Sequence, residues 1–261
     1  MYRVIRLLIA YDGGNYLGWQ RQLQGRTIQG ELETQLAALC GEAITLHGAG
    51  RTDTGVHALG MVAHFQTTTT IPMVAFSKGL NSMLPADIRI LAAEPAPGDF
   101  HSRFSALAKT YRYDFFTGAV MPPCQRQYRA HFPGTFDPHN LRSALQTITG
   151  THDFSSFERA GSRDKNALSG RGAIRTLFGA SCYPALGQEE CWSIKVTGDG
   201  FLRQMVRILA GTLITIGQGK TAATAMADIL ATRDRTQAGL TAPACGLFLE
   251  QILYSPRPFQ P

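Results

Sequence analysis

The chain has 261 residues and a mass of 28.4 kDa, with 44% hydrophobic and 17% charged residues. This composition excludes a disordered chain and indicates a packed globular protein of one or two domains. The formal net charge of +6 and the pI near 9.2 favour a polyanionic partner such as nucleic acid, although many basic proteins bind none.

Hydrophobic periodicity predicts the order β-α-β-β-α-β in the first half of the chain. Apolar residues at Ile28, Leu32 and Leu36 recur at helical spacing behind Thr27, which is a suitable helix cap. The expected elements are a strand at 3–11, a helix from 28, short strands at 44–48 and 61–67, a helix from about 73 and a strand at 87–93.

The second half repeats this order in pattern, although not in residues. The expected elements are a strand at 109–116, a helix at 137–148, strands at 173–183 and 191–198, a helix at 201–216, an added helix at 221–232 and a last strand at 246–254. We therefore expect an α+β fold of two ferredoxin-like halves, residues 1–105 and 106–261, with joined sheets and an active-site cleft between them.

A glycine-rich loop, GAGRTDTGVHALG at 48–60, contains one carboxylate, Asp53, close to the cation Arg51. Glycines let another molecule approach the main chain closely, and this loop offers a cation for phosphate and an anion for another group. The alternative is a simple turn in which the Asp53 side chain accepts hydrogen bonds from neighbouring N–H groups. The residues of the loop alone leave both interpretations open.

Metal and phosphate-loop chemistry have little support in the sequence. Asp53, His57 and His64 lie close together, but His64 belongs to an alternating strand and Gly55 opposes a helical pairing of the other two. No GxxxxGK[ST] segment is present. The five cysteines form no CxxC pair, so we expect reduced, buried thiols rather than a disulfide framework or a zinc knuckle.

Two further stretches carry arginine and tyrosine in regular patterns. In the helix expected at 201–216, Arg203 and Arg207 are four residues apart and share one side, where a solvated face is the common outcome. In the strand at 109–116, Tyr111 shares a side with Lys109, which suits either stacking on a base or packing in the core. The basic segments 121–133 and 159–172 are typical of solvated loops or of loops that close on a ligand.

No stretch reaches the ~18 uninterrupted apolar residues that a membrane helix needs. The apolar run at the start of the chain is broken by Arg3 and Arg6 and has no small-residue cleavage site. We therefore expect a cytoplasmic protein with no membrane partner.

Seven stretches, taken together and in order, resemble the tRNA pseudouridine synthase A family over nearly the whole chain. The most specific is GRTDTGVHA at 50–58. The others are YDGGNYLGWQRQ at 11–22, NSMLPADI at 81–88, FHSRFSALAKTYRY at 100–113, HDFSSF at 152–157, FLRQMVR at 201–207 and TAPACGLFL at 241–249.

The resemblance implies isomerisation of uridine to pseudouridine at positions 38–40 of the tRNA anticodon stem-loop. It places the catalytic carboxylate on Asp53, its arginine partner on Arg207, the base-contacting tyrosine on Tyr111 and tRNA contacts on Arg51 and Arg21. It also implies a homodimer that uses no cofactor. Because this isomerisation adds and removes no atoms, we expect it to need no metal. This chain has Thr54 where the family usually has alanine, beside the catalytic position.

Two other functions compete with this one. A non-catalytic RNA-binding protein on a ferredoxin-like scaffold would share the charge and the fold, but it would have no need of the Asp53 carboxylate. A metal-dependent nuclease would cleave the RNA and lose activity with a chelator.

Overall fold

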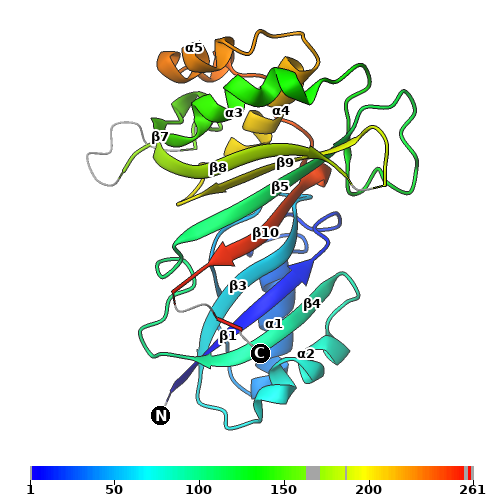
Figure 1. The fold of residues 1–261 in the computed structure, drawn as a ribbon. Helices are drawn as coiled ribbons and strands as arrows, with labels where there is room; N and C mark the ends of the chain where they lie inside the picture. The colour runs from blue at the N-terminus through cyan, green and yellow to red at the C-terminus, as the bar shows by residue number, and fades with distance from the viewer. Residues whose placement is uncertain (1, 163–170, 186, 256–257, 260–261) are drawn as a thin grey trace. The chain divides into compact units, whose positions relative to one another are not determined.

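The structure is a computed structural model that describes residues 2–162, 171–185, 187–255 and 258–259. The chain divides into two compact units, Met1–Lys109 with Phe248–Pro261, and Thr110–Leu247. Each unit combines strands with helices, in agreement with the predicted α+β class (Figure 1). The division into domains at residue 105 stays a prediction.

The first unit is built on a sheet in which the strands follow the order β4–β1–β3–β10, with β2 paired to β3. Their bounds are β1 Arg3–Tyr11, β2 His47–Gly48, β3 His57–Thr67, β4 Ile88–Ala96 and β10 Leu247–Leu253. The pairs β1–β3, β1–β4 and β2–β3 are antiparallel, whereas β10 runs parallel to β3. The last strand of the sequence therefore packs with the N-terminal elements.

Strand β1 forms because its apolar side chains alternate. Ile5, Leu7 and Ile9 are fully buried, while Arg6 and Leu8 between them are partly exposed. The strand predicted at 3–11 is confirmed at both ends.

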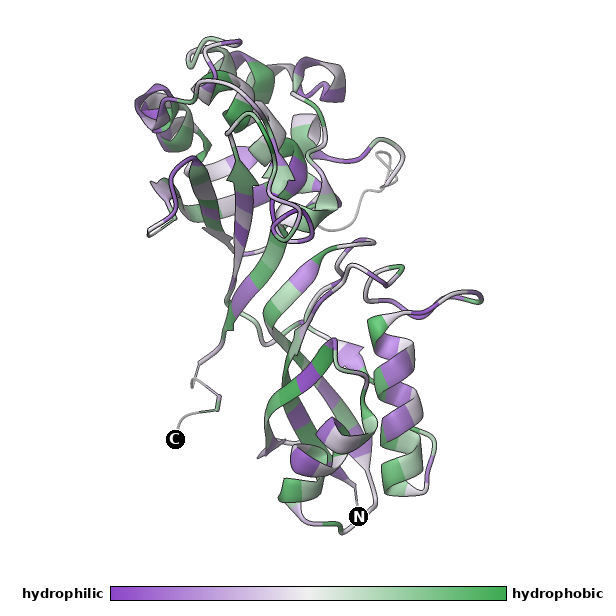
Figure 2. Cartoon of the chain, turned by 90° about the vertical axis from the view of Figure 1, so that its right-hand side faces the viewer, coloured by the Kyte–Doolittle hydropathy of each residue, from purple (hydrophilic) through white to green (hydrophobic). Residues whose placement is uncertain are grey.

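Helix α1, Ile28–Cys40, lies along one face of this sheet (Figures 1 and 2). The Thr27 hydroxyl accepts the Gly30 N–H at 3.2 Å, which confirms the predicted cap. Gly41 ends the helix with a φ of 69°. Both polar and apolar colours run along the helix in Figure 2, because only one side of it faces the core.

The second predicted helix of this unit is divided. Residues Met73–Phe76 form a 3₁₀ turn, and the helix α2 covers only Lys78–Met83. Phe76 and Leu80 are buried, whereas Met83 is 38% exposed. The strand predicted at 44–48 is limited to His47–Gly48.

The second unit has the strand order β5–β9–β8–β7, with β6 paired to β5. The strands are β5 Ala108–Phe116, β6 Ala130–His131, β7 Gly150–Asp153, β8 Ile174–Pro184 and β9 Cys191–Gly198; the helices are α3 Arg142–Ile148, α4 Met205–Gly217 and α5 Ala225–Thr232. Short 3₁₀ turns cover Pro138–Leu141, Ser155–Phe157, Arg235–Gln237 and Ala244–Gly246. Strands β6 and β7 have no counterpart among the predicted elements.

Helix α4 supplies much of the second unit's core, with Ile208, Leu209 and Leu213 buried. It begins at Met205 rather than at Phe201, because Gln204 adopts a left-handed conformation with a φ of 61°. Arg203 therefore precedes the helix. The expectation that Arg203 and Arg207 share one helical face is wrong.

Within the described part of the chain, no helix combines the length and the apolar character that a bilayer crossing requires. All five cysteines are unpaired thiols, as predicted. Only Cys191 is buried, however, and Cys124 is exposed, because it lies in the irregular segment after β5.

Candidate active site

The loop that carries Asp53 connects β2 to β3, and its successive side chains differ in burial. Arg51 and Thr54 are exposed, Thr52 is buried at 7% exposure and Asp53 is half-buried. The Asp53 carbonyl accepts the Val56 N–H at 3.2 Å and closes a turn. The Asp53 side chain is thus partly exposed to a substrate, whereas the main chain that carries it is packed inside the first unit. The exposed position of Thr54 accommodates its hydroxyl without loss of packing.

Two of the loop's glycines serve contacts within the protein. A Cβ at Gly48 would lie 2.6 Å from the Trp19 ring, and one at Gly60 would lie 2.6 Å from the Glu250 carbonyl oxygen. Both positions lie inside the first unit, so no side chain fits there. The interpretation that these two glycines admit a bound molecule is therefore wrong.

A lysine from β5 reaches the base of the loop. The Lys109 ammonium group donates to the Ala49 carbonyl at 2.7 Å and lies near Gly50. It places a second cation beside Arg51 in the same unit. The alternation of the strand indicated which way Lys109 points, but not that the loop lies there.

His57 supports the loop from within the core rather than binding an ion. Its Nδ1 accepts the Gly13 N–H at 3.1 Å and lies 3.0 Å from Asp12 Oδ1, and its ring stacks on Phe248 at 4.8 Å. Among the described residues, no three His, Cys, Asp or Glu side chains are grouped so that they could hold a metal.

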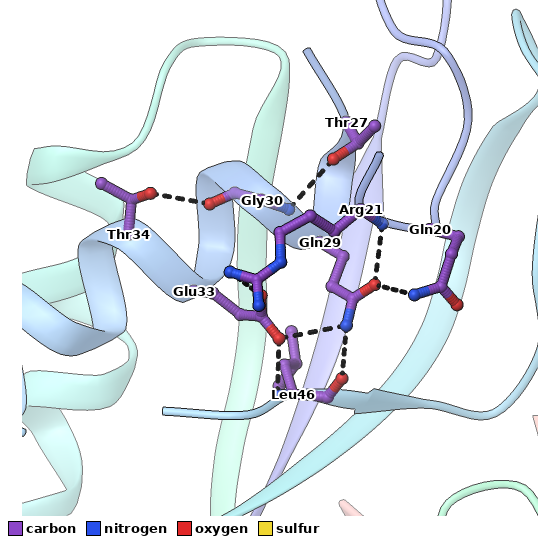
Figure 3. Close-up of polar contacts among 8 residues, drawn as sticks. All are labelled: Gln20, Arg21, Thr27, Gln29, Gly30, Glu33, Thr34 and Leu46. Carbon is purple, nitrogen blue, oxygen red and sulfur yellow. Dashed lines mark hydrogen bonds and ion pairs between the residues drawn. The ribbon is translucent and has the colours of Figure 1, made fainter. Parts of the chain in front are cut away.

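Arg21 is presented by a network that begins at helix α1 (Figure 3). The Gln29 side-chain oxygen accepts the Arg21 backbone N–H at 2.9 Å and the Gln20 amide at 2.8 Å. The Gln29 amide in turn donates to Glu33 Oε1 at 3.0 Å and to the Leu46 carbonyl at 3.1 Å. These bonds fix the backbone at Arg21 against two other segments.

Glu33 balances the charge of Arg21 from a buried position. Its side chain is only 4% exposed, whereas that of Arg21 is 65% exposed. Glu33 Oε1 accepts the Leu46 N–H at 2.9 Å, and Oε2 lies 3.2 Å from Arg21 Nη1 without the alignment of a hydrogen bond. The contact is an ion pair, and it aims the guanidinium while leaving most of it in solvent.

Tyr111, on β5 in the second unit, is largely enclosed. It is 8% exposed and packs edge-on against Phe201, with ring centroids 5.0 Å apart. Its neighbour on the same side of the strand, Tyr113, is fully buried and donates to the Pro243 carbonyl at 2.9 Å. Burial raises the pKa of Tyr113 far above its usual range.

Arg207 is tied to the segment before β10. Its Nε donates to the Ala242 carbonyl at 2.7 Å, and the Ala242 N–H donates to the Arg207 carbonyl at 3.1 Å. This reciprocal pair joins the stretches FLRQMVR and TAPACGLFL, because a backbone carbonyl of the second holds the arginine side chain of the first. Sequence reasoning did not identify Ala242, since only a backbone group is used.

The structure brings Arg51 and Asp53 together in one loop and places Arg21 elsewhere in the same unit. Tyr111 and Arg207 belong to the second unit. Their roles beside Asp53 stay predictions. Of the basic segment 159–172, residues 163–170 lie outside the described residues.

Comparison with known proteins connects this site to an enzyme family. A family model described as tRNA pseudouridine synthase matches residues 7–105 and 144–255. The chain is 49% identical over 252 residues to tRNA pseudouridine synthase A 1 of Desulfotalea psychrophila, covering 97% of this chain and 100% of that one.

Two further relatives carry the same name. Identity is 41% over 254 residues with tRNA pseudouridine synthase A of Syntrophotalea carbinolica, covering 97% of each chain, and 43% over 252 residues with that of Geotalea uraniireducens, covering 97% and 100%. Both matched stretches of the family model include proposed site residues, Asp53 in one and Arg207 in the other. This chain belongs to the tRNA pseudouridine synthase A family.

Proposed function

We propose that this chain converts uridine to pseudouridine at positions 38–40 of the tRNA anticodon stem-loop, with Asp53 as the catalytic carboxylate. As a family member, the chain is an isomerase that acts on tRNA uridine. The observation that supports the finer assignment is the loop itself. Asp53 is half-buried on an enclosed main chain, in the most specific of the family's sequence elements.

The reaction exchanges one bond of the nucleoside for another. The bond from C1′ to N1 breaks, the base turns, and a bond from C1′ to C5 forms; C5 loses its proton and N1 gains one. The overall composition is unchanged, so the reaction consumes no oxidant or reductant. Asp53 acts at the sugar, either by attack on C1′ or by removal of a neighbouring proton.

Arg207 is the proposed partner of Asp53. A guanidinium within a few ångströms favours the ionised carboxylate and orients it. The bond from Arg207 Nε to the Ala242 carbonyl limits the rotation of that side chain. Such restraint supports the proposal, because a misplacement of about 1 Å can cost roughly a hundredfold in rate.

Tyr111 is the proposed surface on which the detached base turns. Stacking of a base on an aromatic ring is worth ~1–3 kcal/mol, which would hold the base during the rearrangement. Arg51 and Arg21 are the proposed contacts to tRNA phosphates, supported by their exposure. Phosphate contacts would offset the few kcal/mol needed to remove the uridine from its stack.

The finer features of the protein belong to the same proposal. The antiparallel pairs β4–β1, β1–β3 and β3–β2 of the first unit support a ferredoxin-like half there, and we propose a second such half at 106–261. We also propose a homodimer that works in the cytoplasm and uses neither cofactor nor metal.

The direct test is conversion of an RNA stem-loop. Purified protein is incubated with uridine-containing anticodon stem-loop RNA with and without EDTA, and modified positions are mapped. We expect pseudouridine at positions 38–40 in intact RNA, and none with Asp53→Asn, which removes the charge with little change of shape. Binding without conversion by the parent protein would indicate the non-catalytic RNA-binding alternative, and cleavage that EDTA abolishes would indicate a nuclease.

A further inference from the structure

The segment Tyr11–Trp19 runs along the Asp53 loop and is bonded to it on both sides of the carboxylate. Before Asp53, the Trp19 N–H donates to the Thr52 carbonyl at 3.1 Å. After it, the Gly55 N–H donates to the Tyr16 carbonyl at 3.3 Å. All of these residues belong to the first unit.

The two segments touch so closely that neither can shift by itself. A Cβ at Gly18 would lie 2.5 Å from the Thr52 carbonyl oxygen, and one at Gly13 would lie 2.0 Å from that of Val56. Gly18 also has a φ of 97°, in the region that other residues avoid. The segment is therefore a backbone support shaped to the loop.

Thr52 connects the loop to the Tyr11–Trp19 segment through a side-chain hydrogen bond. Its hydroxyl lies 2.9 Å from the Tyr11 hydroxyl, and the two residues are 7% and 4% exposed. The Tyr11 ring in turn packs near Trp19, with centroids 6.0 Å apart. Both polar groups of Thr52 beyond its own N–H are thus engaged by the Tyr11–Trp19 segment.

We infer that Tyr11 and Thr52 are positioning residues that hold the Asp53 carboxylate in its reactive place, a role that rests on the proposed function of Asp53. The Thr52 carbonyl and the Asp53 N–H belong to one rigid peptide plane. Fixing Thr52 by its carbonyl and its hydroxyl therefore fixes where the Asp53 side chain starts. Neither hydroxyl reacts; each acts only through the geometry of the loop.

Removal of one hydroxyl from this pair tests the inference. Tyr11→Phe and Thr52→Val each delete the bond and preserve the shape of the side chain, whereas Thr52→Ser keeps a hydroxyl. We expect kcat on stem-loop RNA to fall about tenfold or more in Tyr11→Phe and Thr52→Val, with KM within twofold, and Thr52→Ser to retain most of kcat. The combined variant should be no slower than the slower single variant, since each substitution breaks the same hydrogen bond between Tyr11 and Thr52.

Tyr254→Phe is the matched control. Tyr254 is another buried tyrosine of the first unit, and its hydroxyl donates to the Ser102 carbonyl at 2.6 Å rather than to Thr52 or another residue beside Asp53. We expect it to lose thermal stability as Tyr11→Phe does, without the fall in kcat. If one variant fails to fold, the comparison of Thr52→Ser with Thr52→Val still decides the outcome.

The possible failures are distinguishable. If kcat stays within twofold of the parent in Tyr11→Phe and Thr52→Val while Asp53→Asn is inactive, the positioning role is wrong and the assignment of Asp53 stands. Turnover by Asp53→Asn would instead remove the catalytic assignment itself. Absence of pseudouridine with the parent protein would overturn the proposed function.

Discussion

Each proposed site residue is held by a neighbour that the reaction does not use. Thr52 faces inward between Arg51 and Asp53, so one buried side chain anchors two that face outward. Arg207 depends in the same way on a carbonyl of the segment before β10. The catalysis that we propose for Asp53 depends on such restraint, since a misplacement of about 1 Å can cost roughly a hundredfold in rate.

Arg207→Ala tests the arginine that we pair with Asp53. We expect kcat to fall by about a hundredfold, because the carboxylate would lose both its orientation and its charge partner. The free energy of unfolding should fall by about 1 kcal/mol, because the Ala242 carbonyl loses a donor. Single-turnover kinetics and chemical denaturation measure the two effects.

Arg89→Ala is the control for Arg207→Ala. Arg89 lies in the first unit and likewise donates to backbone carbonyls, those of Pro85 and Ile88. It should lower stability without lowering kcat. An unaltered rate in Arg207→Ala would refute the proposed pairing.

Among the elements, hydrophobic patterns correctly predicted the strands and helices whose formation depends on residues close together in sequence. Strand β1 and helix α1 agree with the prediction because alternation and the Thr27 cap act within a few residues. The start of α4 could not be predicted, because nothing in the hydrophobic pattern marks Gln204 for a left-handed φ, which is uncommon for any residue other than glycine. Strand β7 has four residues, too few for a periodic signal.

The candidate site divides in the same way. Asp53 and Arg51 were identified because a specific motif contains them, and the motif's spacing is a property of the chain. Tyr11 and Glu33 were not, since their roles arise from contacts to residues 41 and 12 positions away in sequence, at Thr52 and Arg21.

Glu33→Gln tests whether helix α1 aims Arg21 at RNA. Glutamine preserves the acceptor for the Leu46 N–H but removes the charge that holds the guanidinium. We expect KM for the stem-loop to rise about threefold to tenfold, with kcat within twofold. Arg21→Ala should give a similar change, and the double variant no more than either, as measured by steady-state kinetics.

Glu31→Gln is the matched control on the same helix. Glu31 forms an ion pair with Arg26 at 2.9 Å. Glu31→Gln therefore makes the same change of charge on helix α1 but leaves the ion pair of Arg21 with Glu33 intact. Its KM should stay near that of the parent. Equal effects of Glu31→Gln and Glu33→Gln would show that net charge, and not the aim of Arg21, governs binding.

The contact of β2 with β3 gives the stability a pH dependence. His64 on β3 lies between His47 and His101, with ring centroids 5.1 and 4.7 Å away. Burial, and then the charges of His101 and His47, lower its pKa from 6.5 to about 4. Between these values the unfolded chain binds a proton that the folded chain does not, so the free energy of unfolding falls as the pH falls from about 6.5 to 4.

Denaturation of the parent and of His64→Gln across that pH range measures the effect. We expect the parent to lose about 1–3 kcal/mol from His64, because each tenfold change in proton affinity is worth ~1.4 kcal/mol. His64→Gln should show a flatter profile, while His139→Gln, at an exposed position in a 3₁₀ turn, should keep the parent's slope. An identical slope in parent and His64→Gln would contradict the assignment.

For the molecule as a whole, the net charge of +6 gives a general electrostatic attraction to a polyanion such as RNA. Each phosphate that a cation neutralises releases counterions. The logarithm of the binding constant therefore falls with the logarithm of the salt concentration, with a slope of ~0.7–0.9 per phosphate contact. General attraction depends on total charge, whereas a phosphate contact depends on one side chain. The two contributions can therefore be separated by where an arginine is removed.

Salt titration of stem-loop binding provides that separation. We expect Arg21→Ala and Arg51→Ala each to reduce the slope of log K against log salt by about 1, since each loses one phosphate contact. Arg142→Ala removes the same charge from an exposed position at the start of α3, so it should leave the slope unchanged. If all three variants reduced the slope equally, binding would follow total charge, and the two arginines would have no assigned phosphates. A reduction confined to Arg21→Ala and Arg51→Ala would place the RNA backbone along the first unit, beside the carboxylate that acts on its sugar.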